Sequence, residues 1–296
     1  MSRTMKGFVA IALYLAGTAL VAAEEIRQII DASEDGLVSI SNPAGSIEVK
    51  GWSRNQVEVN SDLGRGVEEL IFERDGNEVK ILVRVPRNNA RGTSSDLEIR
   101  VPQNSSVKIA GVSADIVTND VHGSQRLQTV SGDIDTYVFE SDIDIDTVSG
   151  DITVRGDDKE LHATIGSVSG DIDVVGLSGE IETGSVSGDV TVADGRFTRV
   201  SMNTTSGDIV FRAQLLNKGR LDVETINGDV DIDFTGAISA RFDVETFNGD
   251  IRNCFGPESR RTSKYAPGRE LVFTEGGGSG RVTIRTLNGD LQMCRD

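Results

Sequence analysis

A row of aspartates is the most regular chemical feature of the sequence. Each follows a Gly and a Ser or Asn in the motif [Ser/Asn]-Gly-Asp-[Ile/Val/Leu], which occurs eight times. Successive copies are 18–21 residues apart, except for a step of 40 residues before the last. The eight residues are Asp133, Asp151, Asp171, Asp189, Asp208, Asp229, Asp250 and Asp290. If the copies stack, their carboxylates lie about 5 Å apart and repel one another, so they need donors or cations between them.

Two arrangements would offset this repulsion. Backbone N–H groups at each turn could donate to the carboxylates, which would make the aspartates structural. Alternatively, Ca²⁺ could bind between copies, because it prefers six to eight oxygen ligands. The known calcium-binding repeat is a nonapeptide with more glycine, so the longer unit here favours the structural role. Additional acids at Asp142, Asp144 and Asp146 make the first units the best calcium candidate.

Arginines form a second row, seven residues before the Ser or Asn of four units: Arg199, Arg220, Arg241 and Arg281. In stacked copies they would form an outward ladder that could bind an anionic glycan or a sulfate. The alternative is that they pair with acids at neighbouring outward positions, since mixed charge is ordinary on a solvated sheet. Those acids are Asp222, Glu224, Asp243 and Glu245.

Catalysis fits the sequence poorly. The two histidines, His122 and His162, occupy unrelated places in their units. A glycosidase needs two carboxylates about 5–10 Å apart in a cleft, but carboxylates are so frequent here that their presence does not discriminate. We therefore expect no enzymatic activity, and the alternative is a polysaccharide lyase or hydrolase built on a β-helix.

The two cysteines occupy the same place in the last two units. Cys254 lies six residues after Asn248, and Cys294 lies six residues after Asn288. Adjacent units would bring their sulfurs within bonding distance, and export would favour oxidation. The sequence therefore predicts a Cys254–Cys294 disulfide that closes the C-terminal end.

The elements that carry these rows are predicted to be two short strands per unit. Aliphatic residues alternate on both sides of the turn, and this period of two indicates strands with one buried face. Gly can adopt φ > 0 at the turn, and the Thr or Ser two residues before it should place its hydroxyl inward, on turn backbone. A period of about twenty residues is typical of stacked repeats. We expect an all-β fold, a parallel β-solenoid with rungs of 18–21 residues and a less regular N-terminal β region.

The chain divides into a targeting segment and one domain. Arg3 and Lys6 precede an apolar run, and Val21-Ala22-Ala23 is typical of a signal-peptide cleavage site. An uncleaved membrane anchor is the alternative, and no later stretch is apolar enough to span a bilayer. The expected bounds are a signal peptide over 1–23, a loose leader over 24–36, irregular rungs over 37–122, regular rungs over 123–254, an excursion loop over 255–279 and a terminal rung over 280–296. Trp52 is expected to cover the open end of the core.

Composition agrees with a thin solenoid of this kind. Aromatic residues make up 5% of the chain, and 33 residues are glycine. The net charge of −17 argues against a nucleic acid or an anionic membrane as partner.

Several segments resemble a known bacterial family. The VSGDI units at 130–134, 148–152 and 168–172, the FNGDI unit at 247–251 and the ends at 45–52 and 268–290 are similar to the putative-adhesin family. Its members carry a β-strand-repeat domain of unknown function, with no catalytic motif to carry over. The resemblance implies an exported solenoid, either periplasmic or on the cell surface. We expect an adhesin or cell-envelope scaffold that binds an envelope glycan or a surface protein on its flat faces, with no cofactor other than the candidate calcium.

Overall fold

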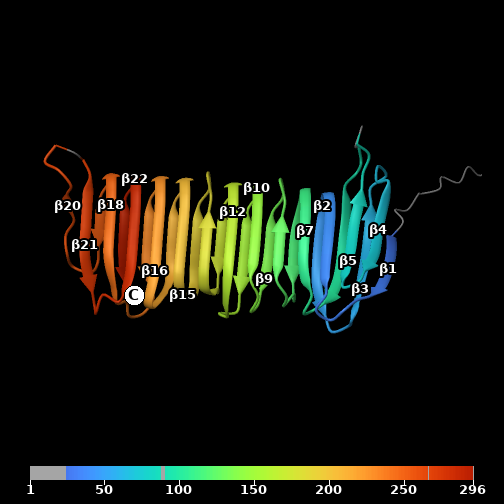
Figure 1. Cartoon of the computed structure of the whole chain (residues 1–296). Coiled ribbons are helices and arrows are strands. Elements are labelled where there is room, and N and C mark those ends of the chain that lie inside the picture. Colours follow the sequence, from blue (N-terminus) through green and yellow to red (C-terminus); the bar gives the residue numbers. More distant parts are fainter. Residues whose placement is uncertain (1–24, 88–90, 266, 296) are drawn as a thin grey trace, which may run out of the picture.

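Strands account for all the regular structure of the residues that the structure describes. The computed structural model describes residues 25–87, 91–265 and 267–295 (Figure 1), and the predicted signal peptide lies outside these ranges. The described residues form no helix, so none that could cross a membrane. The predicted all-β class is confirmed.

The strands are β1 (Glu25–Asp31), β2 (Leu37–Trp52), β3 (Gln56–Leu63), β4 (Glu69–Asp75), β5 (Glu78–Arg84), β6 (Ser95–Pro102), β7 (Ser106–Asn119), β8 (Gln125–Gln128), β9 (Ile134–Val138), β10 (Ile143–Ser149), β11 (Ile152–Gly156), β12 (Glu160–Ser169), β13 (Ile172–Val175), β14 (Ser178–Gly184), β15 (Val190–Ser206), β16 (Ile209–Asn227), β17 (Val230–Phe234), β18 (Ala240–Asn248), β19 (Ile251–Asn253), β20 (Arg260–Arg261), β21 (Arg269–Glu275), β22 (Gly280–Asn288) and β23 (Leu291–Arg295).

Each repeat unit contributes one strand to each of two sheets that share a core. In the middle of the chain, β8, β10, β12 and β14 pair in parallel in the first sheet. Strands β9, β11 and β13 pair in parallel in the second sheet. The long strands β2, β7, β15 and β16 run through both sheets, so the stack is one elongated row (Figure 1).

The core lies between the sheets and follows the alternation of the sequence. Ile145 of the first sheet and Ile152 and Val154 of the second are fully buried, and their equivalents repeat along the stack. In the C-terminal half the core contains a column of phenylalanines, in which Phe211 contacts Phe234 and Phe234 contacts Phe242 at centroid distances of 5.9 Å.

The turns stack so closely that they require glycine. A Cβ atom on Gly170 would lie 2.0 Å from the carbonyl oxygen of Gly150 in the neighbouring unit. The equivalent distance at the other seven turns is 1.9–2.2 Å. We expected glycine to be needed for φ > 0. Of the eight glycines in the motif, Gly150, Gly207 and Gly289 have φ of 157–159°, which is close to extended backbone, so the close approach is the stronger reason.

The N-terminal end is closed by antiparallel strands. β1 pairs with β3, β3 with β6, and β4 with β5, all antiparallel. The expected loose leader is therefore wrong for residues 25–31, because they form β1 and Ile30 packs against the core. Trp52 does not cover the core end as we expected. It lies half-buried on the outward side of β2, where β6 flanks it.

The C-terminal units are stacked in a different order from the sequence. β22 lies between β16 and β18 (Figure 1). In the same way, β23 lies between β17 and β19. The terminal rung expected over 280–296 is thus inserted into the stack and does not end it. Within the expected excursion loop, β21 pairs antiparallel with the outer side of β18, and β20 pairs with β21. The 40-residue step gives the chain enough length to form β21 on the outer side of β18 and then return to form β22 on its inner side.

Candidate functional site

The aspartate row forms a continuous chain of hydrogen bonds. The backbone N–H of each aspartate donates to Oδ1 of the aspartate in the neighbouring unit, with N–O distances of 2.7–3.0 Å. In stack order the row is Asp115, Asp133, Asp151, Asp171, Asp189, Asp208, Asp229, Asp290 and Asp250. Backbone donors therefore offset the repulsion between carboxylates. Among the described residues, no group of three or more acids, His or Cys is placed to hold a metal ion.

The inward Thr and Ser side chains support the same turns. Thr129, Thr204 and Thr246 donate to the carbonyl oxygens of Ala114, Gly188 and Gly289 over 3.0–3.2 Å. These hydroxyls join the turns of neighbouring units, whereas the equivalent hydroxyls of Thr147 and Ser167 are buried without a hydrogen-bond partner.

The arginine row lies in register along the first sheet. Arg199 pairs with Arg220, Arg220 with Arg281, and Arg281 with Arg241 across neighbouring strands. The stack order therefore differs from the sequence order, because β22 is inserted. All four side chains are exposed. Arg241 and Arg281 lie at the start of β18 and β22, whereas Arg199 and Arg220 lie within the long strands β15 and β16, just after a shift in register.

Acids neutralise only part of this row. Arg199 pairs with Glu180 at 3.6 Å, and Arg220 pairs with Asp222 at 2.9 Å. Within the described residues, no carboxylate forms an ion pair with Arg241 or Arg281. Of the four acids that the alternative named, only Asp222 forms an ion pair with an arginine of this row within the described residues, and Glu180 was not among them.

The unpaired arginines line a hollow of about 460 Å³, which we call the basic hollow. Its lining consists of Lys218, Gly219, Arg220, Arg241, Gly278, Ser279, Gly280 and Arg281. Sequence reasoning missed Lys218, which has φ of 65° in the turn before Arg220. Its nearest sequence signal is the Asn-Lys-Gly turn at 217–219.

An exposed apolar row runs along the opposite ends of the first-sheet strands, and sequence reasoning missed it. The residue just before each Ser or Asn of the motif is large and apolar in nearly every unit, with 44–53% of its surface exposed. We call this row the apolar edge; it consists of Val112, Val130, Val148, Val168, Val186, Ile226, Leu287 and Phe247, with Thr205 as its one polar member. The aliphatic residue of each V-S-G-D or I-N-G-D unit was the available signal.

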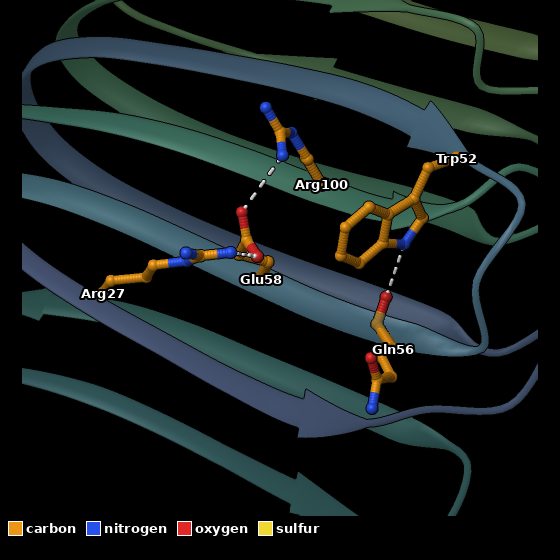
Figure 2. Close-up of polar contacts among 5 residues, drawn as sticks. All are labelled: Arg27, Trp52, Gln56, Glu58 and Arg100. Atoms are coloured by element: carbon orange, nitrogen blue, oxygen red, sulfur yellow. Dashed lines mark hydrogen bonds and ion pairs between the residues drawn. The ribbon is translucent and has the colours of Figure 1, made fainter.

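An ion-pair cluster around one buried carboxylate joins three strands at the N-terminal end. Glu58 of β3 lies between Arg27 of β1 and Arg100 of β6, with O–N distances of 2.6 and 3.3 Å (Figure 2). Its side chain is only 2% exposed, so removing either arginine would leave a buried charge partly unpaired. The indole N–H of Trp52 donates to the carbonyl of Gln56 nearby. The cluster attaches β1 to the stack. The carboxylate of Glu58 already lies between the two arginines and pairs with both.

The two cysteines are joined. Cys254 and Cys294 form a disulfide across a sequence separation of 40 residues, at the ends of the neighbouring strands β19 and β23. The equivalent positions of the two cysteines predict this bond. Because β23 is inserted between β17 and β19, the bond joins an inserted strand to the last unit of the stack.

Comparisons with known proteins give a family and several matching solved structures. A family model described as Toastrack DUF4097 matches residues 23–210 and 178–293. No curated protein matches the chain. A solved structure of a putative lipid binding protein from Parabacteroides distasonis ATCC 8503 is 15% identical, with a TM-score of 0.48, and the match covers 90% of this chain and 96% of that one. A putative adhesin from Bacteroides fragilis NCTC 9343 is 10% identical, with a TM-score of 0.46 and coverage of 92% and 97%.

Proposed function

The chain belongs to the Toastrack DUF4097 family, and from that premise we propose that it is an exported, non-catalytic scaffold of the cell envelope that binds a surface protein. The observation that carries the proposal is the apolar edge. Soluble proteins rarely leave contiguous apolar surface in water unless it meets a partner. Here eight large apolar side chains repeat at one position of the unit, in line along the stack.

The charge beside the apolar edge indicates the kind of partner. The exposed aspartate row runs parallel to it, three residues further along each unit. A partner must therefore present apolar side chains flanked by basic ones, which a protein surface can do and an anionic membrane cannot. The apolar edge supports the adhesive role expected from the sequence, although that expectation placed binding on the flat faces.

Two features support export. The predicted signal peptide over 1–23 would direct the chain out of the cytoplasm, either to the periplasm or to the cell surface. The Cys254–Cys294 disulfide is typical of an oxidising compartment.

The arrangement most similar to a glycosidase site lies beside the apolar edge, where two glutamates line one hollow. Arg285 lies between Glu224 and Glu245 on neighbouring strands, in a hollow of about 510 Å³. The Glu224 side chain is 61% exposed and pairs with Arg285 at 3.8 Å. A glycosidase needs room between its two carboxylates for the glycosidic bond and a water, and here Arg285 lies between the two glutamates. This geometry favours the non-catalytic proposal.

Isosteric substitutions on the apolar edge test the proposal. We expect the triple variant Val148→Thr, Val168→Thr and Val186→Thr to lose most of the binding of the purified protein to cell-envelope fractions, measured by sedimentation. Threonine keeps the β-branched shape, and Thr205 shows that the row accepts it, so the fold should persist. Val175→Thr is the control, because Val175 is also exposed but lies outside the row. Undiminished binding by the triple variant, or no binding by the wild type, would contradict the proposal.

A further inference from the structure

The basic hollow brings together several positively charged side chains, most of which have no acid partner among the described residues. Arg220, Arg281 and Arg241 lie directly opposite one another on three adjacent strands. Like charges at such positions destabilise a sheet, and only Arg220 has an acid partner among the described residues. Lys218 adds a fourth cation to the same hollow. In a chain with a net charge of −17, this is a local surplus of positive charge that an anion would stabilise.

The floor of the hollow is backbone held in place by hydrogen bonds. A Cβ atom on Gly280 would lie 2.8 Å from the carbonyl oxygen of Gly219, so glycine lets the start of β22 approach the bend within β16 and keeps the floor free of side chains. The Ser279 hydroxyl donates to Asn217 Oδ1 at 2.5 Å, and Gly280 N–H donates to the carbonyl of Ser239 at 2.8 Å. These bonds fix the turn before β22 against β16 and β18, so the arginines project from a rigid base.

We propose that the basic hollow binds an acidic glycan, laid along the solenoid axis with its carboxylate or sulfate groups on successive arginines. Guanidinium groups bind such oxyanions with two parallel hydrogen bonds. The row from Arg199 to Arg241 spans four strands, roughly 14 Å at about 4.8 Å per strand, so it suits a chain of anionic groups better than one small ion.

The surroundings restrict the ligand to a thin chain. Asp222 and Asp243 occupy the next outward positions on β16 and β18, two residues beyond Arg220 and Arg241. A wide anionic surface such as a bilayer or a nucleic-acid duplex would meet these carboxylates as well as the arginines. The basic hollow lies at the opposite ends of the strands from the apolar edge, so this site is independent of the proposed protein-binding surface.

Titration calorimetry with defined oligosaccharides tests the proposal. We expect the full-length mature protein to bind hexagalacturonate or a sulfated hexasaccharide, with affinity that falls as salt is added. Arg281→Ala and Arg241→Ala should each weaken binding about tenfold, since a charge-assisted contact contributes about a tenfold factor or more. The two oligosaccharides separate carboxylate from sulfate recognition.

Arg285→Ala is the matched control. Arg285 lies on β22 and the same outward side as Arg281, but at the other end of the strand and paired with Glu224. The Arg285→Ala variant should bind the glycans as tightly as the wild type does. Without ligand, Arg281→Ala should melt at the same temperature as the wild type or higher, because it relieves repulsion. A lower melting temperature, or equal loss of binding by Arg285→Ala, would contradict the proposal.

Other anions complete the test. Inorganic phosphate, single-stranded DNA and vesicles with anionic headgroups should bind more weakly than the hexasaccharides. If any of them binds as tightly and loses affinity in Arg241→Ala, the hollow is a site for that anion and the glycan assignment is wrong.

Discussion

At the residue scale, the turn glycines carry the fold because neighbouring turns nearly touch. Gly170→Ala would place its methyl carbon 2.0 Å from the carbonyl oxygen of Gly150, so one of the two turns must move. We expect the substitution to lower the free energy of unfolding by about 3 kcal/mol, the upper part of the usual range for overpacking. Equilibrium denaturation in urea measures it.

Gly184→Ala is the control for that experiment. A Cβ atom there would have the Asn203 carbonyl oxygen at 3.9 Å as its nearest neighbour, an ordinary contact. It should change stability little, or raise it slightly by restricting the unfolded chain. If the two variants are equally stable, the close approach of the turns does not matter to stability.

At this scale, the sequence predicted features that depend on residues within one unit better than features that depend on contacts between units. The inward positions of Ile145 and Thr246 follow from alternation within one unit, and both are buried. The sequence predicted that Asp171 accepts from a backbone N–H but not which one, because the donor is Asp189 in the next unit. The outward position of Val148 also follows from alternation, because Thr147 before it faces inward. What the sequence did not show is that its equivalents in the other units line up as one exposed apolar row.

At the element scale, the inserted C-terminal strands give the disulfide its importance. β23 lies between β17 and β19, and Cys294 attaches it to Cys254 after β19. The double variant Cys254→Ser and Cys294→Ser should lose about 2–4 kcal/mol of unfolding free energy, since the bond closes a loop of 40 residues. Urea unfolding of the variant and of the wild type measures the loss.

Reduction of the wild type provides the comparison for this prediction. Unfolding in the presence of a reductant should shift the wild type to the stability of the double variant and leave the variant unchanged. If the reduced wild type keeps its stability, the packing of β23 between its neighbours is sufficient and the prediction is wrong.

The strand order at this end could not be predicted from the sequence. The units that contain Asn227, Asn248 and Asn288 present the same rows, so any two of them can stack in register. In the structure Asn288 donates to Asn227, and Asn248 donates to Asn288, each at 2.8 Å. The step of 40 residues indicated an excursion, but not the place where the chain returns. β1 was missed for a related reason, because its partner β3 is distant in sequence and antiparallel.

At the scale of the whole molecule, the fold is close to a one-dimensional array. Outside the two ends, each unit contacts mainly the unit before it and the unit after it, so stability should be a sum of unit and neighbour terms. Residues 152–171 form one complete unit, made of β11 and β12. Deleting them joins Asp151 to Ile172 and restores the motif, with Ile172 in place of Ile152 beside Ile134.

We expect the shortened chain to fold into the same stack with one unit fewer. Its maximum dimension by small-angle X-ray scattering should fall by about 5 Å, one strand spacing, with an unchanged β-type circular dichroism spectrum. Deleting residues 152–161 is the control, because it removes β11 and joins β10 to β12, two strands of the same sheet. That chain cannot alternate between the sheets and should misfold. If the full-unit deletion also unfolds, the units are not interchangeable and the array description fails.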